Sequence, residues 1–407
     1  MKPETKQRIE QIKVGQVPEG YKKTKIGIVP TEWEESKFKK MFSRLNRKNS
    51  ENNDNVLTIS AQYGLISQSE FFNKSIASED KSNYFLLHKG EYAYNKSYSN
   101  GYPYGALKRL EKYEKGIVSP LYICFSATAD NKCPEYYSHY FEGGLMNREI
   151  KAFAQEGARN HGLLNISVDD FFNSYLIQPS TSEQEKIVEI LSEQDKVIEL
   201  KEKLLEEKKK QKKYLMQQLL TGGKRLPGFS GEWVKSRIGD VSDIATGNAD
   251  TQDKVDDGTY PFYVRSPYPE RINTYAYDGE AILTAGDGVG VGKVIHYVIG
   301  KFNYHQRVYK ISDFKDNIYG KYVYYYFSEF FYNRVKKMSA KNSVDSIRLN
   351  MISEMVILLP SLEEQISIAN VLSYADQEID LLQKEIEQEK QKKKALMQLL
   401  LTGIVRV

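Results

Sequence analysis

The segment PSTSEQEKIVEILSEQDKVIELKEKLLEEKKKQKKYLMQQLLTG spans residues 179–222, and it recurs without a gap as PSLEEQISIANVLSYADQEIDLLQKEIEQEKQKKKALMQLLLTG over residues 360–403. About half of the aligned positions are identical. A repeat at a spacing of about 180 residues indicates that the chain is two copies of one design. Each copy opens with Pro-Ser and a Glu-Gln pair, and it closes with Leu-Met-Gln, a leucine cluster and Thr-Gly.

Each copy of the repeat has the start and stop signals of one long helix. Ser180 and Glu183 have the spacing of a capping box, and so do Ser361 and Glu364. In a capping box, the serine oxygen and the glutamate carboxylate each accept a hydrogen bond from a free backbone amide at the helix start. Gly222 and Gly403 supply the stop, and no proline or glycine lies between start and stop. A helix of about 40 residues would be roughly 60 Å long.

A narrow apolar seam runs along each predicted helix. Large residues recur at heptad spacing, which is the pattern of helices that pair in a coiled coil. They are Leu191, Ile198, Leu205 and Leu219 in the first copy and Leu372, Ile379, Ile386 and Leu400 in the second. Both seams carry a lysine at the same place, Lys212 and Lys393. Seams that superpose in this way favour two helices that face each other over two unrelated solvent-facing helices.

The duplication extends beyond the helices. Trp33 and Trp233 each follow a glutamate near the start of a copy and precede a short apolar segment. Each copy is therefore predicted to be a globular domain of about 130 to 150 residues followed by its helix. The predicted organisation is an N-terminal segment 1–24, a domain 25–178, a helix 179–222, a linker and domain 223–359, a helix 360–403 and a tail 404–407.

Apolar runs within the domains predict strands. The run from Ile117 to Phe125 predicts one continuous buried strand. Residues 280–284 and 293–298 predict two strands joined by a tight turn, in which the glycines of 286–292 alternate. The aromatic run Tyr322 to Tyr332 has helical length and is expected to pack on the sheet, with stacking on nucleic-acid bases as the alternative.

Composition excludes several classes of protein. The 407 residues, 40% of them apolar, provide for two cores, and no apolar run approaches the about 18 residues of a bilayer span. The amino-terminal segment lacks the apolar block of a secretory signal, so we expect a cytoplasmic protein. Cys124 and Cys133, the two cysteines, support neither a disulfide framework nor a cysteine zinc site. The net charge of +4 points only weakly to nucleic acid.

No catalytic motif stands out. The alternating glycines of 286–292 match neither a phosphate-binding loop nor a dinucleotide-binding turn. The five histidines show no metal-ligand spacing, and no amino-methyltransferase signature is present. We therefore expect no catalysis, no bound cofactor and no metal in this chain.

Basic and polar clusters also occur in both copies. Ala-Arg-Asn-His at 158–161 corresponds to Ala-Lys-Asn-Ser at 340–343. A cation can neutralise a phosphate, and an asparagine can offer a donor and an acceptor to an adenine edge, although a surface turn explains the same pattern. The candidate DNA contacts are Lys96, Tyr98, Tyr102, Lys108, Arg109, Arg159, Asn160 and His161 in the first domain and Arg265, Lys293, Gln306, Arg307, Lys341, Asn342 and Arg348 in the second.

The chain resembles the specificity subunits of type I restriction-modification systems over nearly its full length. The resemblance rests on V-P-T-E-W at 29–33 and G-F-S-G-E-W at 228–233, on P-S-L-E-E-Q at 360–365, and on the L-M-Q to T-G helix ends. G-I-V-S-P-L-Y at 116–122 and residues 279–293 are similar to segments of target-recognition domains. The first helix start, S-T-S-E-Q at 180–184, departs from the usual P-P-L-E-E-Q pattern.

The resemblance implies a non-catalytic subunit whose two target-recognition domains read the two halves of a bipartite, asymmetric site in double-stranded DNA. It implies that the helices set the spacing and dock two modification subunits, which are adenine methyltransferases and bring S-adenosylmethionine. Restriction subunits would complete the complex, so ATP and Mg²⁺ are also expected on partner subunits. The expected fold class is α+β, with two mixed, strand-rich domains related by a pseudo-two-fold and joined by two long antiparallel coiled-coil helices.

Two other functions are compatible with the sequence. A stand-alone DNA methyltransferase or nuclease would show turnover in the purified chain. A coiled-coil adaptor that binds only proteins would leave no footprint on DNA, even beside a modification partner.

Overall fold

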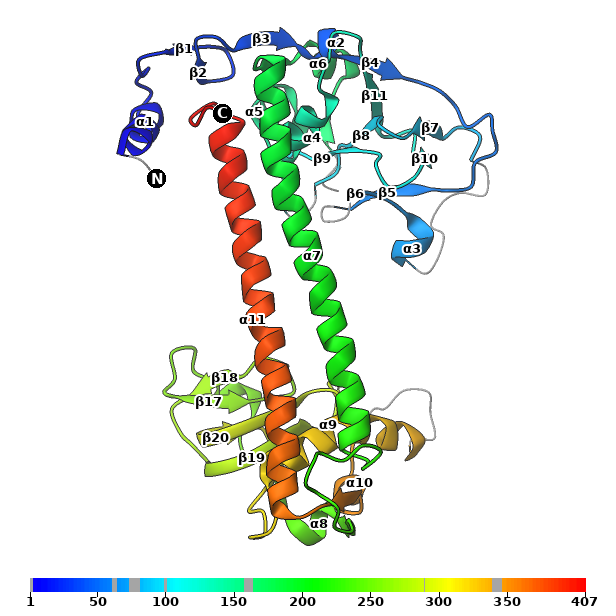
Figure 1. The fold of residues 1–407 in the computed structure, drawn as a ribbon, viewed down its shortest axis with the longest axis vertical. Coiled ribbons are helices and arrows are strands. Elements are labelled where there is room, and N and C mark those ends of the chain that lie inside the picture. Colours follow the sequence, from blue (N-terminus) through cyan, green and yellow to red (C-terminus); the bar gives the residue numbers. More distant parts are fainter. Residues whose placement is uncertain are drawn as a thin grey trace. The chain divides into compact units, whose positions relative to one another are not determined.

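The structure is a computed structural model that divides into two compact units. Unit 1 comprises Met1–Leu200 and Ile386–Val407, and unit 2 comprises Lys201–Glu385. Each unit holds one strand-rich domain and about half of each of two long helices (Figure 1). The described residues are 3–60, 64–72, 81–98, 101–156, 164–288, 290–338 and 346–407.

Unit 1 is built from many short strands. Its elements are α1 (Pro3–Lys13), β1 (Tyr21–Lys23), β2 (Ile28–Pro30), β3 (Glu34–Lys37), α2 (Phe38–Met41), β4 (Phe42–Leu45), β5 (Leu57–Ser60), β6 (Gly64–Ser67), α3 (Gln68–Phe72), β7 (Phe85–His88), β8 (Tyr92–Asn95), β9 (Ala106–Arg109), β10 (Lys115–Val118), β11 (Ile123–Ala127), α4 (Pro134–Glu142), α5 (Asn147–Phe153), β12 (Gln155–Glu156), β13 (Leu164–Asn165), α6 (Val168–Asn173) and β14 (Tyr175–Gln178). The central sheet has the order β4-β11-β8-β9, and every neighbouring pair is antiparallel. Two-stranded ladders join β1 to β2, β3 to β14, β5 to β6, β7 to β10 and β12 to β13.

Unit 2 has one larger sheet. Its domain contains β15 (Val234–Arg237), α8 (Ile238–Val241), β16 (Asp243–Thr246), the 3₁₀ turn η1 (Thr251–Asp253), β17 (Tyr260–Tyr263), β18 (Glu270–Ile272), β19 (Tyr277–Ala285), β20 (Ile295–Tyr304), β21 (Val308–Ser312), α9 (Gly320–Met338), α10 (Leu349–Ser353) and β22 (Val356–Leu359). The sheet order is β16-β21-β19-β20-β17-β18, in which only β17 and β20 run parallel. β15 pairs with β22.

The two domains share their central topology. The order β4-β11-β8-β9 in unit 1 corresponds strand for strand to β16-β21-β19-β20 in unit 2. The next helix also corresponds, because α4 carries Y-Y-S-H-Y-F at 136–141 and α9 carries Y-V-Y-Y-Y-F at 322–327. The predicted α+β class, with two strand-rich domains and two long helices, is confirmed.

The aromatic helices pack on the sheets. In unit 2, α9 contacts β19 and β20 and buries Tyr322, Phe327 and Phe331 in the main core. In unit 1, α4 packs on β9 and buries Tyr136 and Tyr140. The expectation that the run from Tyr322 packs on the sheet is therefore confirmed, and these buried rings are not available to stack on bases.

The predicted strand from Ile117 to Phe125 is wrong, because two strands of different ladders share this run. β10 pairs with β7, whereas β11 joins the central sheet. Ser119 and Pro120 begin the turn between them. Proline lacks the N–H that a ladder requires, so the apolar run cannot continue as one strand.

The predicted hairpin around the glycines is present, but it is not tight. β19 and β20 pair directly, and the loop between them is longer, with 286–288 and 290–294 as its described residues. Gly288 has a φ of 79°. A Cβ on Gly290 would lie 2.7 Å from the carbonyl oxygen of Arg265, so glycine lets this loop lie against the loop between β17 and β18.

Two uninterrupted helices of 39 residues carry the repeat, α7 (Thr181–Leu219) and α11 (Leu362–Leu400). In unit 2 they run antiparallel, because Lys201 pairs with Glu385 and Lys208 pairs with Glu378. Within the described residues, no helix is both long enough and apolar enough to cross a bilayer.

The seam residues lie inside the helix pair and the domain cores. Leu191, Ile198, Leu219, Leu372, Ile386 and Leu400 are buried, while Leu205 and Ile379 are partly buried. Leu191 and Leu400 belong to the main core of unit 1, and Leu219 and Leu372 belong to that of unit 2. Each domain therefore shares its core with the helix ends.

The two seam lysines make equivalent ion pairs. Lys212 pairs with Asp376 in unit 2, and Lys393 pairs with Asp195 at 2.5 Å in unit 1. Lys212 and Lys393 occupy equivalent positions of the repeat, and so do Asp195 and Asp376. Gln194, which lies between the seam positions Leu191 and Ile198, donates its amide N–H to Glu389 Oε2 at 2.8 Å, so this polar side chain has a partner across the helix pair in unit 1.

An arginine after each long helix binds the first turn of the other, a contact that we call the clasp. In unit 2, Arg225 donates Nε–H and an Nη2–H to the two carboxylate oxygens of Glu364, both at 2.6 Å. In unit 1, Arg406 binds Glu183 in the same bidentate way, at 2.5 and 2.9 Å. Both glutamates are buried, and Glu364 is only 1% exposed. The guanidinium of Arg225 also lies 5.3 Å from the ring centroid of Trp233.

The clasp replaces half of each predicted capping box. The backbone N–H of Glu183 donates to Ser180 Oγ at 3.3 Å, and that of Glu364 donates to Ser361 Oγ at 3.4 Å. The glutamate carboxylates do not turn back to the serine amides as predicted. A bidentate guanidinium is the stronger partner for a buried carboxylate, which explains the difference.

The residues after α11 lie against the amino-terminal segment of unit 1. Tyr21 Oη–H donates to the carbonyl of Gly403 at 2.6 Å, and Arg8 donates to the carbonyl of Ile404 at 2.5 Å. Gly403 has a φ of 71° and packs beneath Trp33. The end of α11 therefore returns to the first domain, as the antiparallel arrangement requires.

The contact between the domain and the long helices contains a different side chain in each unit at one equivalent position. In unit 2, Tyr325 of α9 donates to Asp376 Oδ2 at 2.8 Å. The corresponding residue of α4 in unit 1 is His139. Burial, with Lys393 nearby, lowers the pKa of His139 from 6.5 to about 4. This contact in unit 1 therefore contains a neutral imidazole where unit 2 has a phenol.

Arg225→Ala should destabilise unit 2, because the Glu364 carboxylate would stay buried without its partner. We expect the midpoint of thermal unfolding to fall by roughly 5 to 10 °C. Lys224→Ala is the matched control, since Lys224 only lies over the ring of Tyr214, and it should leave the midpoint unchanged. Equal midpoints for the two variants would contradict this role of the clasp.

His139→Tyr should make the stability less sensitive to acid. Unfolded chains take up a proton at this histidine below about pH 6.5, whereas the folded chain does so only near pH 4, so stability is lost as the pH falls through this window. The loss is on the order of 2 kcal/mol. Urea unfolding at pH 7.5 and pH 5 measures it, and the reciprocal change Tyr325→His should add acid sensitivity. A pH dependence unaltered by either change would refute the assignment.

Candidate nucleic-acid interface

The loop after the third strand of each central sheet brings predicted DNA contacts together. In unit 2, the amide of Gly286 donates to the carbonyl of Arg307 at 2.7 Å, and the amide of Ile347 donates to the carbonyl of Gly286 at 2.7 Å. In unit 1, the amide of Leu164 donates to the carbonyl of Lys96 at 3.0 Å. Segments distant in sequence thus meet at the equivalent loop of each domain.

A carboxylate organises the cations of unit 2. Asp287 Oδ1 lies 3.0 Å from Arg265 Nη1, and Asp287 Oδ2 lies 3.8 Å from Arg307 Nε. Asp287 is the less exposed partner in both pairs, and both guanidiniums reach solvent. Because a guanidinium has five N–H donors, each arginine keeps donors for a phosphate or a guanine edge.

Two further predicted cations lie on segments that meet at this loop. Lys293 is exposed, and its ammonium lies 5.3 Å from the ring centroid of Tyr332. Arg348 is exposed at the start of α10, two residues after Ser346, which bridges to Asp287. We call Arg265, Lys293, Arg307 and Arg348, with Asp287, the glycine-loop cluster.

The turn that presents Arg307 is fixed from within. The amide of Arg307 donates to His305 Nδ1 at 2.9 Å, so the ring proton lies on Nε2, which faces Asp250 Oδ1 at 3.6 Å. The predicted contact Gln306 is exposed and donates to Asp250 Oδ2 at 2.8 Å. The sequence did not predict a role for Asp250, Asp287 or His305. These residues lie beside the predicted cations only because the strands of the sheet pair in this register.

In unit 1 the two tyrosines that were predicted to contact DNA, Tyr98 and Tyr102, differ in exposure. Tyr98 is 62% exposed. Tyr102 donates to Glu142 Oε1 at 2.7 Å and accepts from Lys108 Nζ at 3.0 Å, while Lys108 and Glu142 form an ion pair. Burial and the adjacent Glu142 raise the pKa of Tyr102. Burial alone would raise the pKa of Glu142, but the Lys108 ammonium and the two hydrogen bonds hold it below its usual value.

Arg109 is likewise engaged within unit 1. It donates to the carbonyl of Gly90 at 3.1 Å and pairs with Glu135 of α4 at 2.8 Å. Lys108 and Arg109 therefore contribute to the packing of β9 on α4. Contact of these two side chains with DNA stays a prediction. Arg159, Asn160, His161, Lys341 and Asn342 lie outside the described residues.

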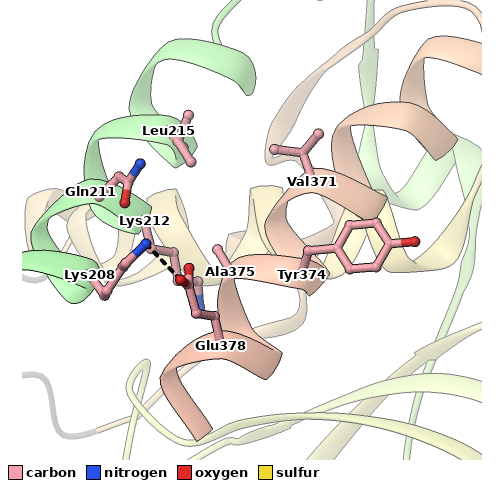
Figure 2. Close-up of a pocket in the computed structure, with 8 residues that line it drawn as sticks. All are labelled: Lys208, Gln211, Lys212, Leu215, Val371, Tyr374, Ala375 and Glu378. Atoms are coloured by element: carbon pink, nitrogen blue, oxygen red, sulfur yellow. Dashed lines mark ion pairs between the residues drawn. The ribbon is translucent and has the colours of Figure 1, made fainter. Parts of the chain in front are cut away.

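A pocket of about 330 Å³ lies between the long helices in unit 2. Figure 2 shows its lining, with the Lys208–Glu378 ion pair at one side and Tyr374 pointing away from it. Ala375 lies on its wall, whereas the repeat places Gln194 at the corresponding position of unit 1. Tyr374 is 69% exposed, so this stretch of α11 presents a large apolar ring to solvent.

The described parts of the chain contain no group of three or more His, Cys, Asp or Glu side chains arranged to hold a metal. The two cysteines, Cys124 and Cys133, are buried and unbonded.

Comparisons with known proteins point to one family. A family model described as type I restriction modification DNA specificity domain matches residues 230–391. The EcoDI specificity subunit of a type I restriction enzyme from Escherichia coli is 29% identical over 174 residues, covering 42% of this chain and 37% of that protein. The putative MjaX specificity subunit from Methanocaldococcus jannaschii is 24% identical over 427 residues, covering 96% of this chain and 97% of that protein.

Solved structures show the same fold. The S subunit of a type I restriction-modification system from M. genitalium superposes with a TM-score of 0.58 at 14% identity, covering 90% of this chain and 96% of that one. A chain from a structural study of complex assembly and conformational transition in the type I R-M system gives a TM-score of 0.59 at 16% identity, covering 93% and 99%.

Proposed function

We propose that this chain, which is similar to type I restriction-modification specificity subunits, supplies the DNA sequence specificity of such a complex without catalysing a reaction. The observation that carries the proposal is the duplicated domain, in which the same strand order presents a different loop in each copy. A shared scaffold with different loops suits the reading of two different sequences.

Each domain would read one half of a bipartite site in double-stranded DNA. The glycine-loop cluster of unit 2 supports this role, because its exposed cations can neutralise phosphates while the Asp287 carboxylate holds two guanidiniums in place. In unit 1 the equivalent loop carries Lys96 and the exposed ring of Tyr98. The difference between the two loops supports an asymmetric target.

The long helices would set the distance between the half-sites and dock two modification subunits. Their unbroken length, about 58 Å at 1.5 Å per residue, supports a spacer role. Apolar side chains that remain exposed on α7 and α11 support docking, and they are Val197, Leu200, Leu204, Tyr214, Leu362, Tyr374 and Leu381. Restriction subunits would join the same assembly in the cytoplasm.

The chemistry would belong to the partners. Modification subunits would bring S-adenosylmethionine for adenine methylation, and restriction subunits would use ATP and Mg²⁺. Methylation requires the adenine to leave the base stack, so the contribution of this chain is to place the partner over the correct base.

Methylation mapping tests this function. We expect co-expression of the chain with its modification subunit to methylate adenines, genome-wide, in one motif of two short specified halves separated by a fixed unspecified gap. A continuous motif, or none, would contradict the proposal. The purified chain alone, incubated with a labelled methyl donor, should incorporate nothing.

The spacer role predicts a change in the gap alone. Four residues inserted after Glu202 in α7 and after Gln383 in α11, which are equivalent positions of the repeat, add about one helical turn and nearly preserve the phase of the seam. The gap should lengthen by roughly one to two base pairs while both halves stay the same. Four residues inserted after Gly228, which lies in an open part of the linker beyond the clasp arginine, should leave the gap unchanged. A changed half-site with an unchanged gap would argue against this role.

A further inference from the structure

The loop between β17 and β18 presents one strongly exposed aromatic ring. Tyr268 is 80% exposed, which is the highest value for any large apolar side chain in the described residues. The ring lies in Arg-Ser-Pro-Tyr-Pro, residues 265–269. The Tyr268 ring therefore contributes little to the core of its domain and is accessible to a partner.

The loop that carries Tyr268 is stiff. Pro267 and Pro269 flank it, and each proline ring fixes a backbone φ angle. The amide of Tyr268 donates to Ser266 Oγ at 3.1 Å, and the strands on either side pair at Phe262 and Glu270. A tyrosine side chain has only two torsion angles. Binding of this ring to a partner would therefore cost little side-chain conformational entropy.

The ring also lies close in sequence to the glycine-loop cluster. Arg265 begins the same loop and is ion-paired with Asp287 at 3.0 Å. The carbonyl oxygen of Arg265 lies against Gly290, where no side chain would fit. The loop that carries the exposed ring therefore packs on the glycine loop, which carries Asp287 and Lys293 of the cluster.

We propose that Tyr268 stacks on a base within the half-site that the second domain reads. This inference rests on the proposed function and names the residue that engages the base stack. Arg265 and Arg307 would hold the phosphates while the ring packs against a base at a step that is easily unstacked. Such a contact selects sequence through deformability and uses no hydrogen bond to a base edge.

Binding by the assembled complex tests the proposal. The chain and its modification subunits are bound to a duplex carrying the methylation motif, and affinity is measured by fluorescence anisotropy over a range of salt concentrations. Tyr268→Ala should weaken binding roughly 5- to 100-fold, which is the loss expected for one stacked base. Tyr268→Phe, which keeps the ring, should bind as wild type does.

The salt dependence separates stacking from charge. Tyr268→Ala removes no charge, so the slope of log affinity against log salt should stay the same, whereas Arg307→Ala should reduce it by about one. Tyr275→Ala is the matched control, because this exposed tyrosine packs on Tyr260 in the same domain and its loss should leave affinity unchanged. With 2-aminopurine placed along the motif, the difference between wild type and Tyr268→Ala should be confined to one half-site.

Three results would overturn the proposal. Wild-type affinity in Tyr268→Ala would exclude a stacking contact, and an equal loss in Tyr275→Ala would assign the effect to the fold. Loss of the modification subunits from the Tyr268→Ala complex, measured by mass photometry, would assign the ring to a protein partner. A wild-type complex without preference for its motif would instead refute the proposed function itself.

Discussion

The buried carboxylate at the start of each long helix is the constraint on which the structure depends. Glu183 and Glu364 are enclosed where a domain, a helix start and the segment after the other helix meet. A buried carboxylate is costly unless matching donors satisfy it. In each unit the arginine after the opposite helix does so, and at Glu183 the indole N–H of Trp33 also donates. The clasp therefore ties the end of one helix to the start of the other in each unit, and a domain core forms around that junction.

The long helices could be predicted because their signals are local. The heptad seam, the serine at the start and the glycine at the end act within a few residues of each other, and the structure has helices over Thr181–Leu219 and Leu362–Leu400. The glutamate of the capping box was predicted wrongly because its partner lies 139 residues away in unit 2 and 223 residues away in unit 1. Likewise, the run from Ile117 to Phe125 holds buried strand residues of two different ladders, and Pro120 marks the break between them.

The candidate interface could be predicted only in part, because its residue types are visible in the sequence but their partners are distant in sequence. Candidate cations such as Arg265 and Arg307 could be picked out from the sequence. Their organising carboxylate, Asp287, could not be, because its loop is brought beside theirs by the pairing of β17 with β20, of β20 with β19 and of β19 with β21. Lys108 and Arg109 show the opposite case, since basic residues that suggest phosphate contacts are matched by carboxylates of α4. Whether a surface cation is already paired is a property of tertiary structure.

The repeated clasp also bears on how such a protein can change through evolution. Arg225 with Glu364 and Arg406 with Glu183 present the same junction to two domains whose loops differ. A domain bounded by these junctions can be replaced as a cassette, because a new domain needs only to fit the clasp and the apolar helix ends. Recombination within the repeated helices would then exchange recognition domains as whole blocks and leave the shared framework intact.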